Sequence, residues 1–455
     1  MDYTQLIENQ REFFRTHQTK DIRFRKEQLI KLQKLVSDNE KALYEAIHKD
    51  FGKSAFDTFT TEISIINKEI EYFLRNLSQL AKPERKWTNL ANLPGSSRVY
   101  SEPLGTVLVI GAWNYPIQLS LLPAISAIAA GNTVILKPSE IAHHTMLVIQ
   151  NLINQHFKPD FFHVCIGGVE ETTEILKQKF DKIFFTGSTQ VGKIVYEAAA
   201  KNLTPVVLEL GGKSPAIVTA DADLEVAARR IVWGKFINAG QTCVAPDFVL
   251  VEEKIKDHFL DYLRDYIKKF DYKAGSEHYA QIINDKNYAR LMQQIDRGKI
   301  YFGGNTDPGT RYIEPTVLDN VNWDDEVMRE EIFGPILPVV SYKYFREAMN
   351  HLAQLEKPLA AYLFSNNPEE IKFFKDNYSF GGGCINDVMM HLSNDALPFG
   401  GVGNSGIGNY HGKYGFEAFS HKKAVLHRKN WGEPAIKYPP YTAKKLSLIR
   451  KLLSW

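Results

Sequence analysis

Residues 182–212 read KIFFTGSTQVGKIVYEAAAKNLTPVVLELGG. An apolar run at 182–185 leads into a glycine turn, a stretch of helical length follows at 191–200, and a second apolar run at 206–208 ends at Glu209. Short β-rich runs that alternate with helices are typical of βαβ units, in which helices cover both faces of a parallel sheet. This stretch therefore predicts an α/β fold.

The same alternation extends on both sides of this stretch. On its amino-terminal side, we predict strands at 106–110, 133–136 and 161–166 and a helix at 119–130. After Gly211, we predict strands at 216–218 and 248–251 and helices at 224–238 and 254–270. The sequence thus indicates two α/β domains that meet near residues 209–212.

The amino-terminal part of the chain has a different pattern. Over residues 21–80, apolar residues recur at spacings of three and four, which predicts a helical layer. Ser37-x-x-Glu40 has the form of a capping box and predicts the start of a new helix there. Asn, Pro, Gly and Ser gather at 87–99, which favours an irregular connection or an edge hairpin.

The composition of the 455 residues narrows the class of protein. With 44% apolar and 24% charged residues, it is typical of a soluble globular protein of two or three domains. The 55 Lys and Arg residues nearly balance the 53 Asp and Glu residues, so no broad positive field favours a nucleic acid partner. Three cysteines are too few for a disulfide framework, which favours a reducing, cytoplasmic location. We identify no signal peptide, and the most apolar long stretch, 117–130, is shorter than the roughly 20 residues of a membrane span.

Two glycine-rich segments have the spacing of nucleotide-binding loops. Gly187 to Lys193 follows a predicted strand and matches a Walker A loop, but Ile194 stands where that loop needs Ser or Thr for magnesium. The free N–H groups of a helix start at this point favour a pyrophosphate, and the alternative is a tight turn without a ligand. Gly401 to Gly406 matches G-x-G-x-x-G, but it follows no early buried strand and no acidic residue closes a βαβ unit, so we interpret it as a loop.

Cys243 and Glu209 are candidate catalytic residues on local sequence. Cys243 lies in a polar loop after a predicted helix, where a thiol among backbone N–H donors can be a nucleophile or simply a structural residue. Glu209 ends a buried strand, so its carboxyl is either a general base with a raised pKa or a structural group with satisfied hydrogen bonds. Cys165 ends an apolar strand and is predicted to be inert, whereas Cys384 is either a packing residue or close to a site.

Hydrolase and metal motifs are not found in the sequence. It contains no G-x-S-x-G and no H-E-x-x-H, the signatures of common hydrolases. Its 13 histidines have no ligand-like spacing beyond the adjacent His143 and His144, so we predict no metal site.

Six short motifs occur in an order that resembles the signature of the aldehyde dehydrogenase superfamily. They are Trp113-Asn-Tyr-Pro116, Lys137-Pro-Ser-Glu140, Phe185-Thr-Gly-Ser188, Glu209-Leu-Gly-Gly-Lys213, Gly240-Gln-Thr-Cys243 and Glu331-Ile-Phe-Gly-Pro335. The segments 181–187 and 410–421 are similar to the class 3 branch of this family, which includes fatty and aromatic aldehyde dehydrogenases. The resemblance covers nearly the whole chain.

The resemblance implies an aldehyde dehydrogenase-like α/β fold. It has two parallel-sheet domains, a Rossmann-type cofactor domain and a catalytic domain, together with a small oligomerisation hairpin. The implied boundaries are 1–82 and 101–209 for the NAD(P)-binding domain, 210–404 for the catalytic domain, 83–100 and 405–430 for oligomerisation or bridging segments, and 431–455 for a basic amphipathic tail.

The resemblance also implies the catalytic roles. Cys243 would attack the aldehyde carbon, and the Asn114 side chain and the Cys243 backbone N–H would hold the oxyanion that forms. The adduct would pass a hydride to a nicotinamide cofactor and leave a thioester, which water activated by Glu209 would hydrolyse to a carboxylic acid.

The implied cofactor is NAD, with NADP as the alternative. The resemblance places Lys137 on the adenosine ribose with Glu140 beside it, and a carboxylate there disfavours a 2′-phosphate. The other implied cofactor contacts are Gly187, Ser188 and Gly192 at the pyrophosphate turn, Glu331 on the nicotinamide ribose, Phe333 near the ring, and also Trp113 and Val191.

The substrate and the partners are less well specified by the sequence. Tyr115, Trp233 and Phe236 lie close to the catalytic motifs and either line a tunnel for a medium- or long-chain aliphatic or aromatic aldehyde or pack in the core. The tail at 431–455 could contact an anionic membrane surface or pack on a subunit, and the resemblance implies a homodimer.

Two alternative functions compete with aldehyde oxidation to the acid. A CoA-acylating relative would transfer the acyl group to a thiol and would not need Glu209 to activate water. A catalytically silent binding or structural relative would not need Cys243, Glu209 and Asn114 together. The presence of these residues in the sequence disfavours both alternatives.

Overall fold

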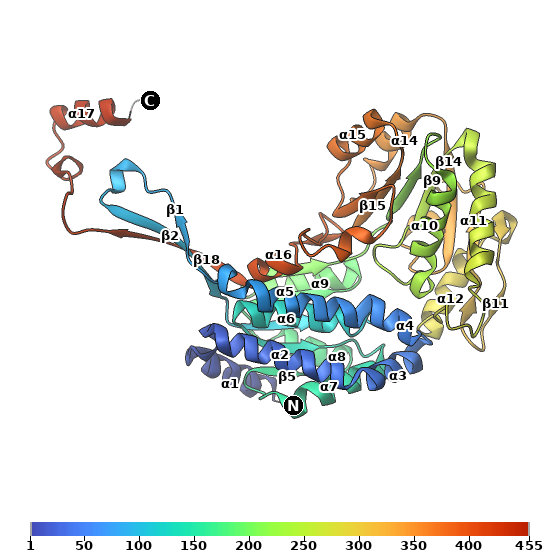
Figure 1. Ribbon diagram of the computed structural model, residues 1–455, viewed down its shortest axis with the longest axis horizontal. Coiled ribbons are helices and arrows are strands. Elements are labelled where there is room, and N and C mark those ends of the chain that lie inside the picture. The colour runs from blue at the N-terminus through green and yellow to red at the C-terminus, as the bar shows by residue number, and fades with distance from the viewer. Residues whose placement is uncertain (1, 454–455) are drawn as a thin grey trace. The chain divides into compact units, whose positions relative to one another are not determined.

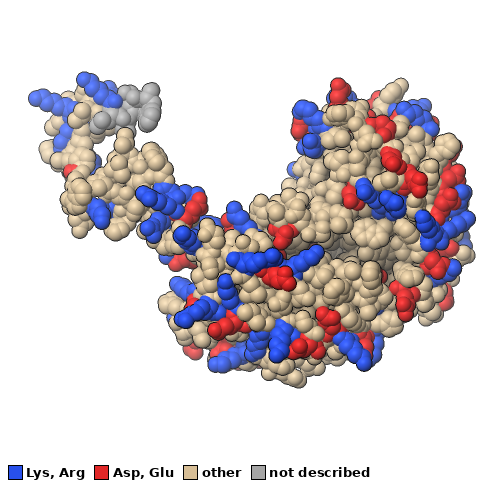
Figure 2. Space-filling model, viewed as in Figure 1, with Lys and Arg blue, Asp and Glu red and all other residues tan. Residues whose placement is uncertain are grey.

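The computed structural model describes residues 2–453, which divide into two compact units (Figure 1). The larger unit consists of the residues up to 77 and of 103–420, and the smaller unit consists of 78–102 and the residues from 421 onward. Basic and acidic side chains are interspersed on the face shown in Figure 2, as expected from the nearly balanced charge. Among the described residues, no helix has the length and apolar composition that crossing a membrane requires.

The first sheet of the larger unit is mostly parallel, and its parallel strands are buried. Its strands are β3 (Thr106–Ile110), β4 (Thr133–Lys137), β5 (Phe162–Val164), β6 (Lys182–Thr186), β7 (Val206–Glu209) and β17 (Gly406–Ile407). Their order is β17-β7-β6-β3-β4-β5, and only β17 is antiparallel to its neighbour. Every residue of β3 to β7 is buried, which explains their continuous apolar runs. The five strands predicted for this part of the chain are confirmed.

Helices pack on both faces of this sheet (Figure 1). They are α1 (Tyr3–Arg15), α2 (Ile22–Asp38), α3 (Glu40–Phe51), α4 (Ala55–Thr58), α5 (Ser64–Leu80), α6 (Gln118–Ala130), α7 (His143–His156), α8 (Val169–Leu176), α9 (Thr189–Ala200) and α16 (Gly412–Ala418). α6 is buried along its whole length because it contacts the sheet together with α2 and α16, and it is accordingly apolar on all sides. The predicted helical layer at 21–80 is confirmed.

The predicted capping box at Ser37 is wrong. Ser37 lies inside α2, which continues to Asp38 because Val36 packs in the core. Asn39 separates α2 from α3, and its side-chain amide donates to the carbonyl of Leu35 at 2.8 Å instead of capping the new helix. Because only one residue separates the two helices, Ser37 has no free helix start to cap.

The second sheet of the larger unit is also mostly parallel. Its strands are β8 (Pro215–Val218), β9 (Phe248–Glu252), β10 (Ile300–Phe302), β13 (Thr316–Leu318), β14 (Ile336–Tyr342), β15 (Ala360–Phe364) and β16 (Gly382–Ile385), in the order β10-β13-β14-β9-β8-β15-β16. Only β10 is antiparallel to its neighbour. A separate small ribbon pairs β11 (Thr306–Asp307) with β12 (Tyr312–Ile313). The strands predicted at 216–218 and 248–251 are confirmed.

The helices of this second half are α10 (Leu224–Phe236), α11 (Lys256–Phe270), α12 (Asp285–Gln294), α13 (Glu326–Arg329), α14 (Phe345–Leu352) and α15 (Pro368–Asn377). The helix predicted at 224–238 ends earlier, at Phe236. Asn238 and Ala239 have left-handed backbone angles, with φ of 53° and 51°, and such residues cannot continue a right-handed helix.

The smaller unit contains a three-stranded sheet and the C-terminal segment. β1 (Glu84–Lys86) and β2 (Gly95–Pro103) form an antiparallel hairpin in which Glu84 pairs with Val99, and β18 (Ser420–Arg428) pairs with β2. The edge hairpin predicted around 87–99 is confirmed. The tail forms α17 (Ala443–Leu453), and residues 454–455 of the predicted tail lie outside the described residues.

Glu69 is a buried carboxylate that ties α5 to the start of α16. It accepts hydrogen bonds from the backbone N–H of Gly412 at 2.9 and 3.1 Å and from Ser126 Oγ at 3.3 Å. Burial raises the pKa of its carboxyl from 4.5 to about 7, although these hydrogen bonds oppose the shift. Folding therefore favours the protonated form of Glu69.

We expect the Glu69→Gln variant to show a weaker pH dependence of stability than the wild type. The contribution of Glu69 is most favourable below pH 4.5 and is lost as the pH rises through about 7, a difference of about 3 kcal/mol at most. Glutamine has a similar shape and stays neutral at all these pH values. Thermal unfolding of both proteins between about pH 5 and pH 8 measures the effect. Wild-type and variant curves that run parallel over this range would contradict the expectation.

Candidate active site

Four parallel strands of the first sheet end at residues that the sequence singled out. Asn114 follows β3, Lys137 ends β4, Gly187 follows β6 and Glu209 ends β7. The carboxyl ends of parallel strands meet at one edge of a sheet, and this edge is where ligands bind in open α/β folds. The fold therefore brings together motifs that are up to about 95 residues apart.

The second sheet contributes the amino-terminal ends of its strands to the same site. The segments 211–213, 240–243 and 331–335 all come just before strands, namely β8, β9 and β14. The carboxyl edge of the first sheet and the amino edge of the second border a cleft of about 1660 Å³, which residues of both halves line. A volume of this size can hold a dinucleotide and a further small molecule.

Eleven of the twelve predicted site residues line the cleft. These are Trp113, Asn114, Lys137, Glu140, Gly187, Ser188, Val191, Glu209, Cys243, Glu331 and Phe333. Gly192 is the exception, because it is buried in the first turns of α9 and does not line the cleft. A Cβ on Gly192 would lie 2.6 Å from Leu210 Cδ2, so this glycine allows α9 to pack closely on the sheet.

The loop before Cys243 has an unusual backbone. Asn238, Ala239 and Gly240 have φ of 53°, 51° and 72°, three left-handed residues in a row. A Cβ on Gly240 would lie 2.3 Å from the carbonyl oxygen of Gly334, so only glycine fits there. Such strain is found mainly where the surrounding structure holds a functional residue in place.

Gln241 anchors this loop from inside. Its side-chain amide donates to the carbonyls of Asn238 at 3.1 Å and Gln281 at 3.0 Å, and its Oε1 accepts from the N–H of Ile283 at 3.0 Å. All three bonds are largely buried and hold the strained turn against a distant segment. The Gly-Gln-Thr-Cys motif is therefore a rigid support for Cys243.

Asn114 lies beside this loop. Its Nδ2 donates to the carbonyl of Gln241 at 3.1 Å, and Asn238 Nδ2 donates to the carbonyl of Asn114 at 2.9 Å. The amide of Asn114 carries two N–H groups, and one of them is enough for the bond to Gln241. The second is available to a ligand oxygen in the cleft next to Cys243.

The thiol of Cys243 is half-buried, and its surroundings favour the protonated form. Burial raises its pKa from 9.0 to about 12, with smaller contributions from the charges of Glu331 and Glu209. The backbone N–H groups of Cys243 and Val244 act in the opposite direction. Donors surround the sulfur as the sequence suggested, but a base must remove the proton before the sulfur can attack.

Glu209 is a carboxylate without a hydrogen-bond partner in the described part of the chain. Its side chain is 3% exposed, and neither Oε1 nor Oε2 is within bonding distance of a donor. Desolvation raises the pKa of this carboxyl well above 4.5. Buried polar groups normally have partners, so the structure argues against the alternative of a satisfied structural carboxylate. A buried carboxyl with a raised pKa is suited to accept a proton near neutral pH.

The other end of the cleft has features that fit a dinucleotide. Lys137 Nζ lies 3.2 Å from Glu140 Oε2, which places a cation and an anion at the end of β4. Ser188 caps α9 by accepting from the N–H of Val191 at 3.4 Å, so the free N–H groups of this helix face the cleft as an anion site. These donors and charges suit a pyrophosphate and a ribose.

A carboxylate and an aromatic pair line the cleft between these two ends. The rings of Trp113 and Phe333 meet edge to face with centroids 5.3 Å apart. Glu331 lies against Gly211, where a Cβ would be 1.9 Å from Glu331 Oε2, and burial raises the pKa of its carboxyl to about 8. Glu331 lines the cleft, where its carboxylate can accept hydrogen bonds from the hydroxyls of a ribose.

Some residues that support the site were not predicted from the sequence. Asp247 forms an ion pair with Lys213 and accepts from the N–H of Ile332 at 2.9 Å, so it fixes the segment that carries Glu331. Lys213 also donates to the carbonyl of Glu330 at 2.9 Å. No sequence motif marks Asp247, and only its place four residues after Cys243 could have drawn attention to it.

The predicted substrate residues divide into two groups. Tyr115 and Trp233 line the cleft. Phe236 does not, because it is fully buried and packs against Tyr272 with ring centroids 6.0 Å apart, so its alternative role in the core is the correct one. Cys165 is buried with its pKa raised to about 12, as expected of an inert thiol.

Cys384 does not line the cleft, and its Sγ lies 3.6 Å from His391 Nδ1. Gly401 to Gly406 forms a loop that ends in the short edge strand β17, as predicted. It therefore takes no part in a βαβ unit.

A parallel-sheet edge with a helix N-terminus, joined in one cleft to a thiol and an unpartnered carboxylate, defines a dinucleotide-dependent oxidoreductase. Comparison with known proteins agrees. The aldehyde dehydrogenase family matches residues 1–425. Aldehyde dehydrogenase family 3 member A2 of Rattus norvegicus is 47% identical over 97% of this chain and 92% of its own length. The dimeric NADP-preferring aldehyde dehydrogenase of Mus musculus is 46% identical over 96% of this chain and 98% of its own length.

The fold is likewise similar to that of a solved structure. Staphylococcus aureus AldH in a substrate-bound state has a TM-score of 0.97 and 45% sequence identity, with 99% of each chain covered. The chain belongs to the aldehyde dehydrogenase family. It is an oxidoreductase that oxidises an aldehyde to the carboxylic acid with NAD(P)+. The predicted fold class and the resemblance to the class 3 branch are confirmed.

Proposed function

We propose that Cys243 is the nucleophile, that Asn114 helps to hold the oxyanion, and that Glu209 is the base that activates water. One observation carries this division of roles: Glu209 is buried without a partner in the same cleft as Cys243, and its charge is close enough to raise the pKa of the thiol. A buried carboxyl whose two oxygens have no donor among the described residues is placed to accept a proton from a water molecule in the cleft.

The steps follow from these positions. The Cys243 thiol first gives its proton to a water molecule in the cleft. The thiolate then forms a bond to the carbonyl carbon, and the oxygen takes up the negative charge beside the Asn114 amide and the Cys243 N–H. When bound, NAD(P)+ supplies the acceptor for the hydride that leaves this carbon. The C=O bond re-forms and a thioester of Cys243 remains. Glu209 then takes a proton from water, the hydroxide adds to the thioester, and the carboxylic acid leaves as the sulfur is released.

We propose NAD+ as the preferred cofactor, on the basis of the carboxylate of Glu140 beside Lys137. A 2′-phosphate near this carboxylate would be repelled. NADP+ is the alternative cofactor, because the mouse relative is described as NADP-preferring.

We expect Glu140→Gln to shift cofactor preference toward NADP+. Removing the negative charge beside the proposed ribose site is expected to improve kcat/KM for NADP+ relative to NAD+ by about 10-fold. The ratio of the two kcat/KM values, measured with one aldehyde at fixed ionic strength, gives the result. An unchanged ratio would show that Glu140 does not face the ribose 2′ position.

We propose a medium- or long-chain aliphatic or an aromatic aldehyde as substrate. The cleft that Tyr115 lines also has apolar side chains in its lining, including Phe56, Ile65, Trp233 and Ile237. Transfer of apolar chain into such a lining is favourable by about 0.8 kcal/mol for each methylene group. Longer aldehydes should therefore have lower KM values.

The test is the rate of NADH and NADPH formation across aliphatic aldehydes of increasing length and benzaldehyde, with and without CoA. CoA-independent turnover with kcat/KM that rises with chain length supports the proposal. A strict requirement for CoA would favour the acylating alternative. A flat dependence on length would contradict the substrate class.

We also propose a homodimer in the cytoplasm, with a C-terminal tail that can contact an anionic membrane surface. The mouse relative is described as dimeric, and this chain has only three cysteines, as a reducing compartment favours. α17 carries Lys444, Lys445 and Arg450 together with the exposed Leu446 and Leu448. Sedimentation with vesicles of neutral and anionic lipid distinguishes this contact from packing of the tail on a subunit.

A further inference from the structure

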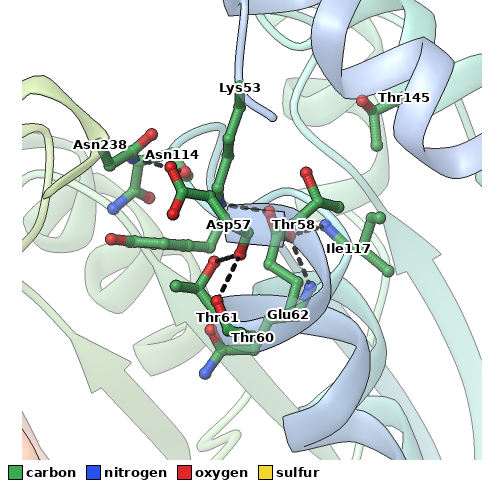
Figure 3. Close-up of polar contacts among 12 residues, drawn as sticks. Lys53, Asp57, Thr58, Thr60, Thr61, Glu62, Asn114, Ile117, Thr145 and Asn238 are labelled. Atoms are coloured by element: carbon green, nitrogen blue, oxygen red, sulfur yellow. Dashed lines mark hydrogen bonds and ion pairs between the residues drawn. The ribbon is translucent and has the colours of Figure 1, made fainter. Parts of the chain in front are cut away.

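Lys53 and Glu62 form an ion pair that is completely shielded from solvent. Lys53 Nζ lies 2.9 Å from Glu62 Oε1, and both side chains are 0% exposed (Figure 3). Neither residue lines the cleft. The cost of removing two charges from water largely cancels their attraction, so a buried ion pair contributes little net stability. The pair can instead hold other groups in position.

The second oxygen of Glu62 fixes the start of α6. Oε2 accepts from the backbone N–H of Ile117 at 2.8 Å and of Gln118 at 3.2 Å (Figure 3). The first N–H groups of a helix have no partner within the helix, so this carboxylate determines where α6 begins. Asn114 lies only three residues before Ile117, so the same contact restrains the segment that carries it.

Glu62 reaches this point because of a local irregularity in the helix. Residues 59–63 form a π-helical turn between α4 and α5. The wider turn is rare and is frequently found at functional sites. It directs Glu62 into the interior, whereas Thr60 and Thr61 of the same turn line the cleft.

Lys53 restrains the same segment through Tyr115. Its ammonium lies over the Tyr115 ring, 4.3 Å from the centroid, and Tyr115 Oη is 2.6 Å from Thr242 Oγ1. Thr242 is the residue before Cys243. The residues next to Asn114 are therefore held from one side by the ion pair and from the other by the catalytic loop.

We propose that Lys53 and Glu62 are positioning residues that set the Asn114 amide at the distance from Cys243 that the oxyanion requires. Through Tyr115 and Ile117 they fix the segment that follows Asn114 relative to the loop of Cys243. The inference rests on the proposed oxyanion role of Asn114. Hydrogen-bond donors in an oxyanion site work because they are already in place, and a misplacement of about 1 Å can lower the rate by about 100-fold.

The first experiment compares Lys53→Met, the neutral double variant Lys53→Met/Glu62→Gln and Tyr115→Phe with the wild type. The rate of the first NADH turnover in rapid mixing with excess NAD+ and a saturating aldehyde reports formation of the thioester. We expect this rate to fall by about 100-fold in Lys53→Met and by about 10-fold in Tyr115→Phe, which keeps the ring but loses the bond to Thr242. Tyr115→Phe keeps the test valid if Lys53→Met does not fold.

Two further readouts separate a positioning effect from general damage. The dissociation constant of NADH should stay within about twofold of wild type, since all the proposed cofactor contacts except Trp113 lie on other elements. Alkylation of Cys243 by iodoacetamide should also stay within about twofold, because that reaction develops no oxyanion. An alkylation rate that falls as much as the aldehyde reaction would overturn the proposal.

The matched control is Lys256→Met. Lys256 pairs with Asp319 at 2.9 Å, is mostly buried and lies outside the cleft. It should lose thermal stability without a change in the first-turnover rate. If Lys53→Met behaves in the same way, the ion pair is structural only and the inference fails.

A double-mutant cycle tests whether Lys53 acts through Asn114. Asn114→Ala should slow the first turnover, and Lys53→Met added to it should have little further effect, because the group that it positions is already gone. Equal losses in both backgrounds would overturn the inference but not the proposed function. A first turnover that is unchanged in Asn114→Ala would overturn the oxyanion role and this inference with it.

Discussion

Replacement of Cys243 by alanine should abolish aldehyde oxidation. The side chain would supply the only bond between protein and substrate in the proposed sequence, and without it no thioester forms and no hydride is released. Loss of a nucleophile typically lowers kcat by about 10⁴-fold or more. NADH formation should therefore fall to the detection limit in both the first turnover and the steady state.

Cys384→Ala is the control for this variant. Cys384 is also a half-buried free thiol, but it does not line the cleft. Its removal should leave kcat within about twofold, since substitutions away from a site usually have small effects. Binding of NADH to Cys243→Ala should be retained, which shows that the fold and the cofactor end of the cleft are intact. Residual turnover above about 1% of the wild type would contradict the role of Cys243.

The elements that sequence predicted well are those with a strong local signal. The runs at 106–110 and 206–208 contain consecutive Val, Ile and Leu, and such runs are unambiguous when both faces of a parallel sheet are covered. The position of Glu209 at the end of one such run also predicted its burial, and the structure adds that it has no partner.

The failures have a common physical origin in tertiary context. Ser37-x-x-Glu40 has the letters of a capping box, but packing of Val36 extends the previous helix through it. For Phe236, the sequence left a role in a substrate tunnel and a role in the core open, and only the structure shows that the side chain packs in the core. The local spacing of residues does not specify which face of a helix or strand is buried, or which element packs against it.

The supporting residues of the site could not be predicted from the sequence at all. Glu62 meets Lys53 and Ile117 only after α3, the π-helical turn and α6 are assembled. Asp247 becomes important through its contact with Ile332, 85 residues away. Such contacts depend on the packing of complete elements, whereas the motif residues are recognisable because glycine, cysteine and strand-end carboxylates have local requirements.

Glu209→Gln should separate the two halves of the reaction. Glutamine keeps the size of the side chain but cannot accept the proton from water, so hydrolysis of the thioester should slow by about 10²- to 10⁴-fold. Hydride release comes before this step, so the variant should still form close to one NADH for each active site in a rapid first phase. Rapid-mixing measurements of NADH followed by the steady-state rate give both quantities.

The control for this variant is Glu370→Gln. Burial raises the pKa of the Glu370 carboxyl as well, but this residue lies outside the cleft. It should retain both the burst and the steady-state rate. Loss of the burst in Glu209→Gln would assign Glu209 to the first half of the reaction, for instance to deprotonation of Cys243, and would contradict the proposed division of roles.

The pH dependence provides an independent signature of the same residue. Burial without a partner raises the pKa of Glu209, and only its carboxylate form can accept a proton from water. The steady-state rate of the wild type should therefore fall as the pH drops through this raised pKa. In Glu209→Gln the remaining slow hydrolysis should lose this acidic limb, because no group at position 209 titrates. A limb that persists unchanged in the variant would place the titrating base elsewhere in the cleft.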